Sequence, residues 1–198
     1  MPTRIAPLEP PYEPTTGELL ARMMPPGQPP IGLFRTFARN PTMTEAMHGW
    51  GSYVLSRRFS VSMREREIVI DRVCACCGCE YEWGVHVAYF AERVGLTREQ
   101  IASLTYGGPD DACWTERRER TLIAAVDALH DRADLDDAAF AAMRQWYDDA
   151  AILDLVLLAG WYHAISFVAR TAGVALEPDA PRFDDYLTTP ARPPGPLG

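Results

Sequence analysis

The sequence predicts an all-α fold, and three observations support this prediction. Helix signals are dense in the middle of the chain, no segment alternates apolar and polar residues as a strand does, and the prolines avoid the middle. Nine of the 17 prolines fall in residues 1–30 and six fall after residue 177, whereas only Pro41 and Pro109 lie between. Proline removes a backbone donor and fixes φ. We therefore expect a Pro-rich arm over 1–30, one helical domain over 31–177 and a Pro-rich tail over 178–198.

End signals and helical spacing divide the domain into seven or eight helices. The Asn40-Pro41 pair separates the first two, because the residue before a proline avoids the helical region. Capping boxes at Ser62–Glu65 and Thr97–Gln100 open two more, and Gly78 and Gly95 end the helices before them. The helices expected in this way cover residues 17–24 in the arm and 33–39, 42–55, 63–77, 79–94, 98–104, 116–131, 135–147 and 150–171 in the domain.

The last of these helices is unusually apolar. Residues 150–169 contain one formally charged side chain, Asp154, and are long enough to cross a bilayer. They also contain Tyr162 and His163, and they lack the flanking aromatic and basic anchors of a membrane segment. We expect a central helix buried on all sides by its neighbours. Thr115 and Asp134 are expected to cap the two helices before it.

Composition excludes several classes of function. The net charge is −8 and all 19 basic residues are arginine, so no lysine can form a Schiff base or bind the phosphates of a P-loop. The acidic balance argues against a nucleic-acid partner. The first residues form no apolar leader, so a cytoplasmic protein without a membrane partner is expected.

Four of the five cysteines fall within six residues, at Cys74, Cys76, Cys77 and Cys79. In a reducing compartment such a group is redox-active, metal-binding or simply buried. The spacing lacks the two separated cysteine pairs of a structural zinc site, so no metal and no cofactor is expected. Cys74 and Cys77 are interpreted as small packing residues.

The segment from Glu67 to His86 carries the chemistry. On a helix Cys79, Glu82 and His86 share one face, and Glu82 can orient or charge the ring four residues later. Glu67 lies on the preceding helix, among apolar neighbours. It either joins these groups in proton transfer or faces solvent at the edge of that stripe.

Several ordered segments resemble one family. REREIVIDR, GCEYEWGVH, RVGLTREQI, WTERRERTLIAAVDALHDR and LVLLAGWYHAISFVARTAGV are similar to segments of the carboxymuconolactone decarboxylase and alkylhydroperoxidase D (AhpD)-like superfamily. The resemblance covers about residues 33–175. It implies an antiparallel helical bundle that assembles into homotrimers or homohexamers, with the Pro-rich arms as candidates for contacts between subunits or closure of the pocket.

The peroxidase branch of this family uses a glutamate, two cysteines and a histidine at fixed spacing. Glu67, Cys79 and His86 match the glutamate, the first cysteine and the histidine. Glu82 stands where the second, peroxide-attacking cysteine is expected, and Tyr81 replaces a further histidine. The disulfide cycle of the family cannot run on these positions.

This departure leaves three functions open. In the first, the protein is a lyase of the decarboxylase type that performs non-redox acid/base chemistry on a small carboxylated or carbonyl substrate. His86 would then be the acid or base, with Glu82 or Glu67 setting its charge. The other residues expected in that pocket are Tyr81 as a further catalytic group and Arg72, Trp83 and His163 as substrate contacts.

In the second, the cysteine pair has moved upstream, so that Cys76 and Cys79 form a CxxC dithiol. Such a thiol peroxidase would use Glu67 and His86 as a proton relay and would need a dithiol reductant as partner. In the third, the Glu82–His86 pair is structural and the helical domain is a non-catalytic binding or scaffold protein.

Overall fold

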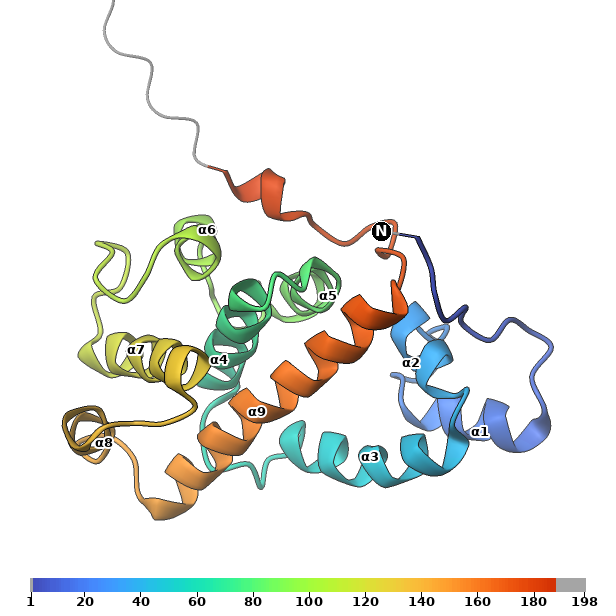
Figure 1. The fold of residues 1–198 in the computed structure, drawn as a ribbon, viewed down its shortest axis with the longest axis horizontal. Coiled ribbons are helices and arrows are strands. Elements are labelled where there is room, and N and C mark those ends of the chain that lie inside the picture. The colour runs from blue at the N-terminus through green and yellow to red at the C-terminus, as the bar shows by residue number, and fades with distance from the viewer. Residues whose placement is uncertain (1, 188–198) are drawn as a thin grey trace, which may run out of the picture.

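The computed structural model describes residues 2–187, which form nine α-helices, one short 3₁₀-helix and no strand (Figure 1). The all-α prediction is confirmed. The helices are α1 (Pro14–Arg22), α2 (Gly32–Phe37), α3 (Pro41–Val54), α4 (Met63–Cys76), α5 (Glu80–Phe90), α6 (Arg98–Tyr106), α7 (Arg117–Arg132), α8 (Asp137–Met143) and α9 (Asp149–Ala172), followed by η1 (Phe183–Tyr186).

Helix α4 is the centre of the fold. It packs against α5, α6, α7 and α9, which surround it in Figure 1. Nine of its 14 residues are buried, so it has no wide solvent face. Its first turn is held by the expected capping box, in which the Ser62 hydroxyl accepts from the Glu65 amide and the Glu65 carboxylate accepts from the Ser62 amide. The helix therefore places any polar side chain that it carries inside the protein.

Helix α9 is buried on one side only, and the expectation that it is covered on all sides is wrong. It is the one helix in residues 2–187 that is long and apolar enough to cross a membrane, and half of its most apolar stretch is buried in the protein. Leu155, Leu158 and Ile165 pack into the core, whereas Leu153 and Phe167 are more than 60% exposed. The helix is therefore apolar on two faces, of which one packs in the core and the other is exposed.

The N-terminal residues lie against their own chain. The amides of Arg4 and Ile5 both donate to the carbonyl of Ala172, at 2.7 and 3.0 Å. Helix α1 begins earlier than the expected 17–24 because Pro14 suits the first turn of a helix, and it buries Leu19 and Leu20. This arm is therefore part of the folded domain, and it covers α2 and the end of α9.

The C-terminal segment up to residue 187 also packs on the domain. The rings of Phe183 and Tyr186 lie 4.9 and 5.4 Å from the ring of Trp83. Gly84 allows this approach, since a Cβ there would lie 2.7 Å from the carbonyl oxygen of Pro181. The remaining part of the expected tail, TTPARPPGPLG, lies outside the described residues.

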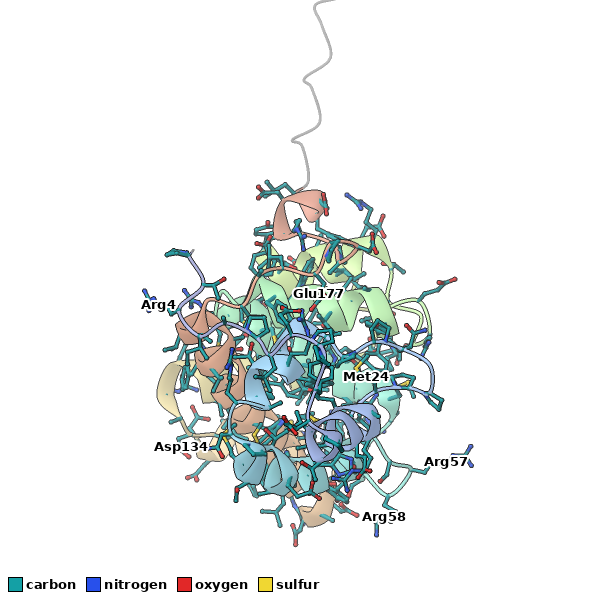
Figure 2. All side chains as sticks on the ribbon, turned by 90° about the vertical axis from the view of Figure 1, so that its right-hand side faces the viewer. Arg4, Met24, Arg57, Arg58, Asp134 and Glu177 are labelled. Carbon is teal, nitrogen blue, oxygen red and sulfur yellow. The ribbon has the colours of Figure 1, made fainter. Side chains whose placement is uncertain are left out.

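Two expected helix caps differ from the structure. Asp136, not Asp134, caps α8, because its carboxylate accepts from the amide of Ala139. Helix α7 starts after Glu116 without a side-chain cap, so Thr115 does not have the expected role. In the loop between α3 and α4, Arg57 and Arg58 project away from the ribbon into solvent (Figure 2).

Candidate active site

The centre of the site is a buried ion pair between α4 and α5. Nδ1 of His86 lies 2.7 Å from Oε2 of Glu67, and both side chains are almost fully buried. The other carboxylate oxygen of Glu67 accepts from Nε of Arg66 at 2.9 Å. Arg66 is itself buried and also donates to the carbonyl of Val54. Glu67 therefore does not face solvent, and its charge is balanced by a guanidinium on one side and an imidazole on the other.

The second ring nitrogen of His86 faces two further groups. The hydroxyl of Tyr162, on α9, lies 3.1 Å from Nε2. Oε1 of Glu82 lies 3.6 Å from the same nitrogen, as the spacing of four residues on α5 predicts. Oε2 of Glu82 is buried and has no hydrogen-bond partner within residues 2–187. We refer to His86, Glu67, Glu82 and Tyr162 as the cavity cluster.

These neighbours decide the protonation of His86. Burial alone disfavours the charged ring, but the charges and hydrogen bonds of Glu67 and Glu82 outweigh it and raise the pKa of His86 to about 10. At neutral pH the ring is an imidazolium that donates from Nδ1 to Glu67 and from Nε2 to the oxygen of Tyr162. Burial and the charge of Glu82 raise the pKa of Tyr162 well above its ordinary value, so its hydroxyl stays protonated.

The cavity cluster forms the polar wall of a cavity of about 250 Å³. His86, Glu82 and Tyr162 all line it. The rest of the lining is mainly apolar and comes from α2, α3, α5, α9 and the segment after α1, for which the main contributors are Met23, Met24, Leu33, Phe34, Phe37, Met47, Val54, Tyr89, Phe90 and Trp161. The N-terminal arm therefore supplies part of the cavity wall, and a bound molecule would meet one polar corner in an apolar enclosure.

Asp71 lies one turn further along α4, buried and near the cluster. Burial first, and then the charge of Glu67, raises the pKa of Asp71 well above its ordinary value. A raised pKa favours the neutral form of Asp71, which would add no second negative charge beside Glu67.

Four residues expected in the pocket, Tyr81, Trp83, Arg72 and His163, are not among those that line this cavity. The hydroxyl of Tyr81 donates to Glu177 at 2.6 Å and accepts from the amide of Leu33 at 2.9 Å, so it joins α5 to α2 and the C-terminal segment. Trp83 is fully buried beneath Phe183. Helical rotation explains both placements, since residues 81 and 83 lie about 100° to either side of residue 82.

Arg72 and His163 have other partners as well. Arg72 pairs with Asp127 on α7, with Nε 2.6 Å from Oδ1, and donates to the carbonyl of Leu104. Nδ1 of His163 lies 2.9 Å from the carbonyl of Ala159, and Nε2 lies 2.9 Å from Nδ1 of His130. Neither residue lines the cavity.

The two cysteines of the expected dithiol also lie outside the cavity lining. Cys79, at the start of α5, is almost fully buried, and burial raises the pKa of its thiol. Cys76 is half-buried beside Asp127, and burial raises its pKa to about 11. Both thiols are therefore protonated at neutral pH, which lowers their reactivity as nucleophiles.

Sequence reasoning missed Arg66, Tyr162 and most of the cavity wall. The signal for Arg66 was its position beside Glu67 in a helix that offers no wide solvent face. Tyr162 had a weaker signal, a hydroxyl in an otherwise apolar helix, where a buried phenol requires a partner. The cavity-lining residues between α1 and α3 show no local sequence pattern that predicts their role.

The comparisons with known proteins agree with the all-helical fold. The carboxymuconolactone decarboxylase family model matches residues 41–127, which include Glu67, Glu82 and His86. A search of curated proteins finds no sequence match. Among solved structures, the debrominase Bmp8, as a cysteine-to-alanine variant in complex with 2,3,4-tribromopyrrole, is 16% identical over 90% of this chain and 94% of its own, with a TM-score of 0.74.

Two further structures are similar to the chain over most of its length. An uncharacterized peroxidase-related protein from Silicibacter sp. TM1040 is 18% identical over 92% of this chain and 97% of its own, with a TM-score of 0.73. A putative antioxidant defence protein AhpD from Agrobacterium tumefaciens is 20% identical over 70% of this chain and 93% of its own, with a TM-score of 0.63. The family model matches residues 41–127 and these solved structures share the all-helical fold, so the chain is similar to members of the carboxymuconolactone decarboxylase and AhpD-like superfamily.

Proposed function

We propose that the protein is an enzyme that performs non-redox acid/base catalysis on a small, largely apolar carbonyl or carboxylated compound. One observation carries the proposal: an imidazolium, a carboxylate with a free oxygen and a neutral phenol meet at the polar corner of an apolar cavity. These are the groups that proton transfer next to a carbonyl requires, a base to take a proton and donors to hold the developing oxyanion.

Each group has a distinct task in this proposal. Oε2 of Glu82 has no partner within the described chain, so it is free to accept a proton or a hydrogen bond from the substrate. The hydroxyl of Tyr162 accepts from His86 and donates to a substrate oxygen. His86 supplies the proton through Nε2, while Glu67 and Arg66 hold the ring in place from the opposite side.

Decarboxylation is the type reaction of this class. Breaking the C–C bond releases carbon dioxide and leaves the electron pair as an enolate. The enolate oxygen accepts a hydrogen bond from Tyr162, and its carbon takes the proton from Nε2 of His86. Solvent then returns a proton to the ring, so that charge and protons balance over the cycle.

The cavity supports a flat, apolar substrate. Its walls are mainly aromatic, aliphatic and methionine side chains, and its volume of about 250 Å³ suits a molecule of one small ring. The neighbouring structure of Bmp8 holds 2,3,4-tribromopyrrole, a ligand of that size. The thiols support redox chemistry less well, because neither Cys79 nor Cys76 reaches this cavity.

The test compares two variants with the unmodified protein. Small β-keto acids and cyclic ketones are incubated in deuterated water, and carbon dioxide release and deuterium uptake are followed by NMR. His86→Asn should lower the rate by about 10²- to 10⁴-fold, the usual contribution of a general acid or base. Cys79→Ala, on the same helix, should keep the activity.

The opposite pattern would overturn the proposal. If hydroperoxide consumes the free thiols, a dithiol reductant restores them, and Cys79→Ala and Cys76→Ala abolish turnover while His86→Asn keeps part of it, then the protein is a thiol peroxidase. If no substrate of either class turns over and His86→Asn binds the same small molecules equally well, the cavity cluster is structural.

A further inference from the structure

A second group of chemically active side chains lies away from the cavity. Cys77 ends α4, His130 lies near the end of α7 and His163 lies in the middle of α9. The sulfur and one nitrogen of each ring lie within 4.8 Å of one another. In Figure 1 the end of α7 approaches α9 beside α4. We call these three residues the thiol–histidine cluster.

Hydrogen bonds fix which ring atoms point into this cluster. Nδ1 of His163 lies 2.9 Å from the carbonyl of Ala159, and a carbonyl only accepts, so Nδ1 carries a proton. Nε2 of His163 therefore has a free lone pair when the ring is neutral, and it faces Nδ1 of His130 at 2.9 Å. A metal-binding histidine whose other nitrogen donates to a carbonyl has this arrangement, because the donor bond holds the ring and fixes its tautomer.

The backbone holds Cys77 firmly in position. Gly78 has φ +60°, and the amide of Cys79 donates to the carbonyl of Cys74 at 2.8 Å, which closes a Schellman motif at the end of α4. Arg170 on α9 donates to the carbonyl of Cys77. All three side chains thus project from helices or a helix end, and such sites are more exact in geometry than sites on loops.

We propose that the thiol–histidine cluster binds one divalent transition-metal ion of the zinc type. A thiolate with two imidazoles is a ligand set suited to zinc. Bonds of about 2.0–2.1 Å to nitrogen and about 2.3 Å to sulfur place tetrahedral ligand atoms roughly 3.3–3.7 Å apart. The two nitrogens, now 2.9 Å apart, need to separate by only a few tenths of an ångström.

Binding is a proton exchange with a simple balance. The metal replaces the proton of the Cys77 thiol, which is released to solvent, and the proton on Nδ1 of His130 moves to Nε2 of the same ring. Three protein ligands leave the fourth tetrahedral position for water. Because binding releases the thiol proton, uptake of the metal should increase with pH.

The experiment loads the full chain, kept reduced with a metal-free phosphine, with Zn²⁺ or Co²⁺. Equilibrium dialysis should give one equivalent of zinc, and cobalt should produce a thiolate-to-metal charge-transfer band in the near ultraviolet. Zinc should also raise Tm, since an ion that binds only the folded state stabilises it. Changing an outer partner weakens a metal site about 10- to 100-fold, so Cys77→Ser and His163→Gln should each weaken binding by at least about 100-fold.

Two substitutions of the same residue types serve as controls. Cys76→Ser removes the adjacent thiol, which faces Asp127, and His48→Gln removes a histidine outside the cluster. Both should keep the equivalent of metal and the cobalt band. The proposal is overturned if no equivalent binds, if cobalt binds without the thiolate band, or if Cys77→Ser and His163→Gln bind as well as these controls.

Discussion

The cavity cluster and the thiol–histidine cluster use the same side chain in opposite ways. His86 lies between the carboxylates of Glu67 and Glu82, which keep both ring nitrogens protonated. His163 instead donates to a backbone carbonyl and faces a thiol and a second ring. The difference teaches that a histidine becomes an acid where its partners hold a charge that retains the proton. It can bind a metal where one ring nitrogen donates to a carbonyl and the other keeps a lone pair that points toward further metal-binding side chains.

The largest test of this comparison is Glu67→Gln. The change keeps the shape of the side chain but leaves the buried guanidinium of Arg66 and the ring of His86 without an anion. Breaking one partner of a buried ion pair costs about 3–5 kcal/mol, and we expect the free energy of unfolding in urea to fall by that amount. Glu92 is an exposed residue just after α5, and Glu92→Gln is the control. It should change the free energy of unfolding by no more than about 0.5 kcal/mol.

The two clusters should still be separable in this variant. If Glu67→Gln remains folded at low temperature, cobalt binding by the thiol–histidine cluster should be unchanged. A loss of stability below about 1 kcal/mol would contradict the buried pair, because an exposed ion pair contributes no more than that.

The second prediction concerns pH. The pKa of His86 is about 10 in the folded protein against 6.5 for an unperturbed ring, so protonation stabilises the folded state. This contribution is complete below about pH 6.5 and is lost as the pH rises through about 10, with a slope of at most about 1.4 kcal/mol per pH unit. The free energy of unfolding of the unmodified protein should therefore decrease across this window.

Variants isolate the source of that slope. The decrease between pH 6.5 and 10 should largely disappear in His86→Gln. It should be reduced much less in His163→Gln, whose ring is partly exposed. If His86→Gln and His163→Gln reduced the pH dependence of stability equally, His86 would not be the special charged histidine that the comparison requires.

The sequence predicts those parts of the site that depend on neighbours along a helix. The capping box at Ser62, the end of α4 at Gly78 and the Glu82–His86 contact all involve residues within four positions, where helix geometry leaves little choice. The pairing of Glu67 with His86 came from the family pattern. Helix number and type were predictable for the same local reason.

The remaining parts depend on which helix each face meets. Tyr162 lies 76 residues from His86, and His163 lies 33 residues from His130, so no spacing rule connects them. Adjacent residues on α9 therefore enter different clusters, since a step of one residue turns a side chain by about 100°. Arg72 shows the same limit, because only the packing of α4 on α7 directs it to Asp127.

A third prediction separates the two carboxylates of the cavity cluster. Glu82→Gln removes a charge and a hydrogen bond that both raise the pKa of His86, so that pKa should fall, yet remain above 6.5 because Glu67 stays in place. Ring titration followed by NMR measures the change. Glu80→Gln, two residues away and bonded to the amide of Phe183, is the control and should leave the titration unaltered.

The smallest effects test the cavity wall itself. Gly49 and Gly51 both lie in α3, and a Cβ at either position would meet nothing within 4 Å. Gly51 lines the cavity, whereas Gly49 does not. Because glycine is unfavourable inside a helix by about 0.8–1.0 kcal/mol, Gly49→Leu and Gly51→Leu should each stabilise the protein by up to about 1 kcal/mol.

Only Gly51→Leu should also lower turnover or binding of small carbonyl compounds, because its side chain enters the space that a substrate needs. Neither variant should alter metal uptake, which belongs to the other side of α9. Equal loss of activity in both variants would show that the apolar enclosure is not where the substrate binds. If only Gly51→Leu loses activity while both variants gain stability, the reaction at His86 takes place inside the cavity. This conclusion would not depend on changing any residue of the cavity cluster.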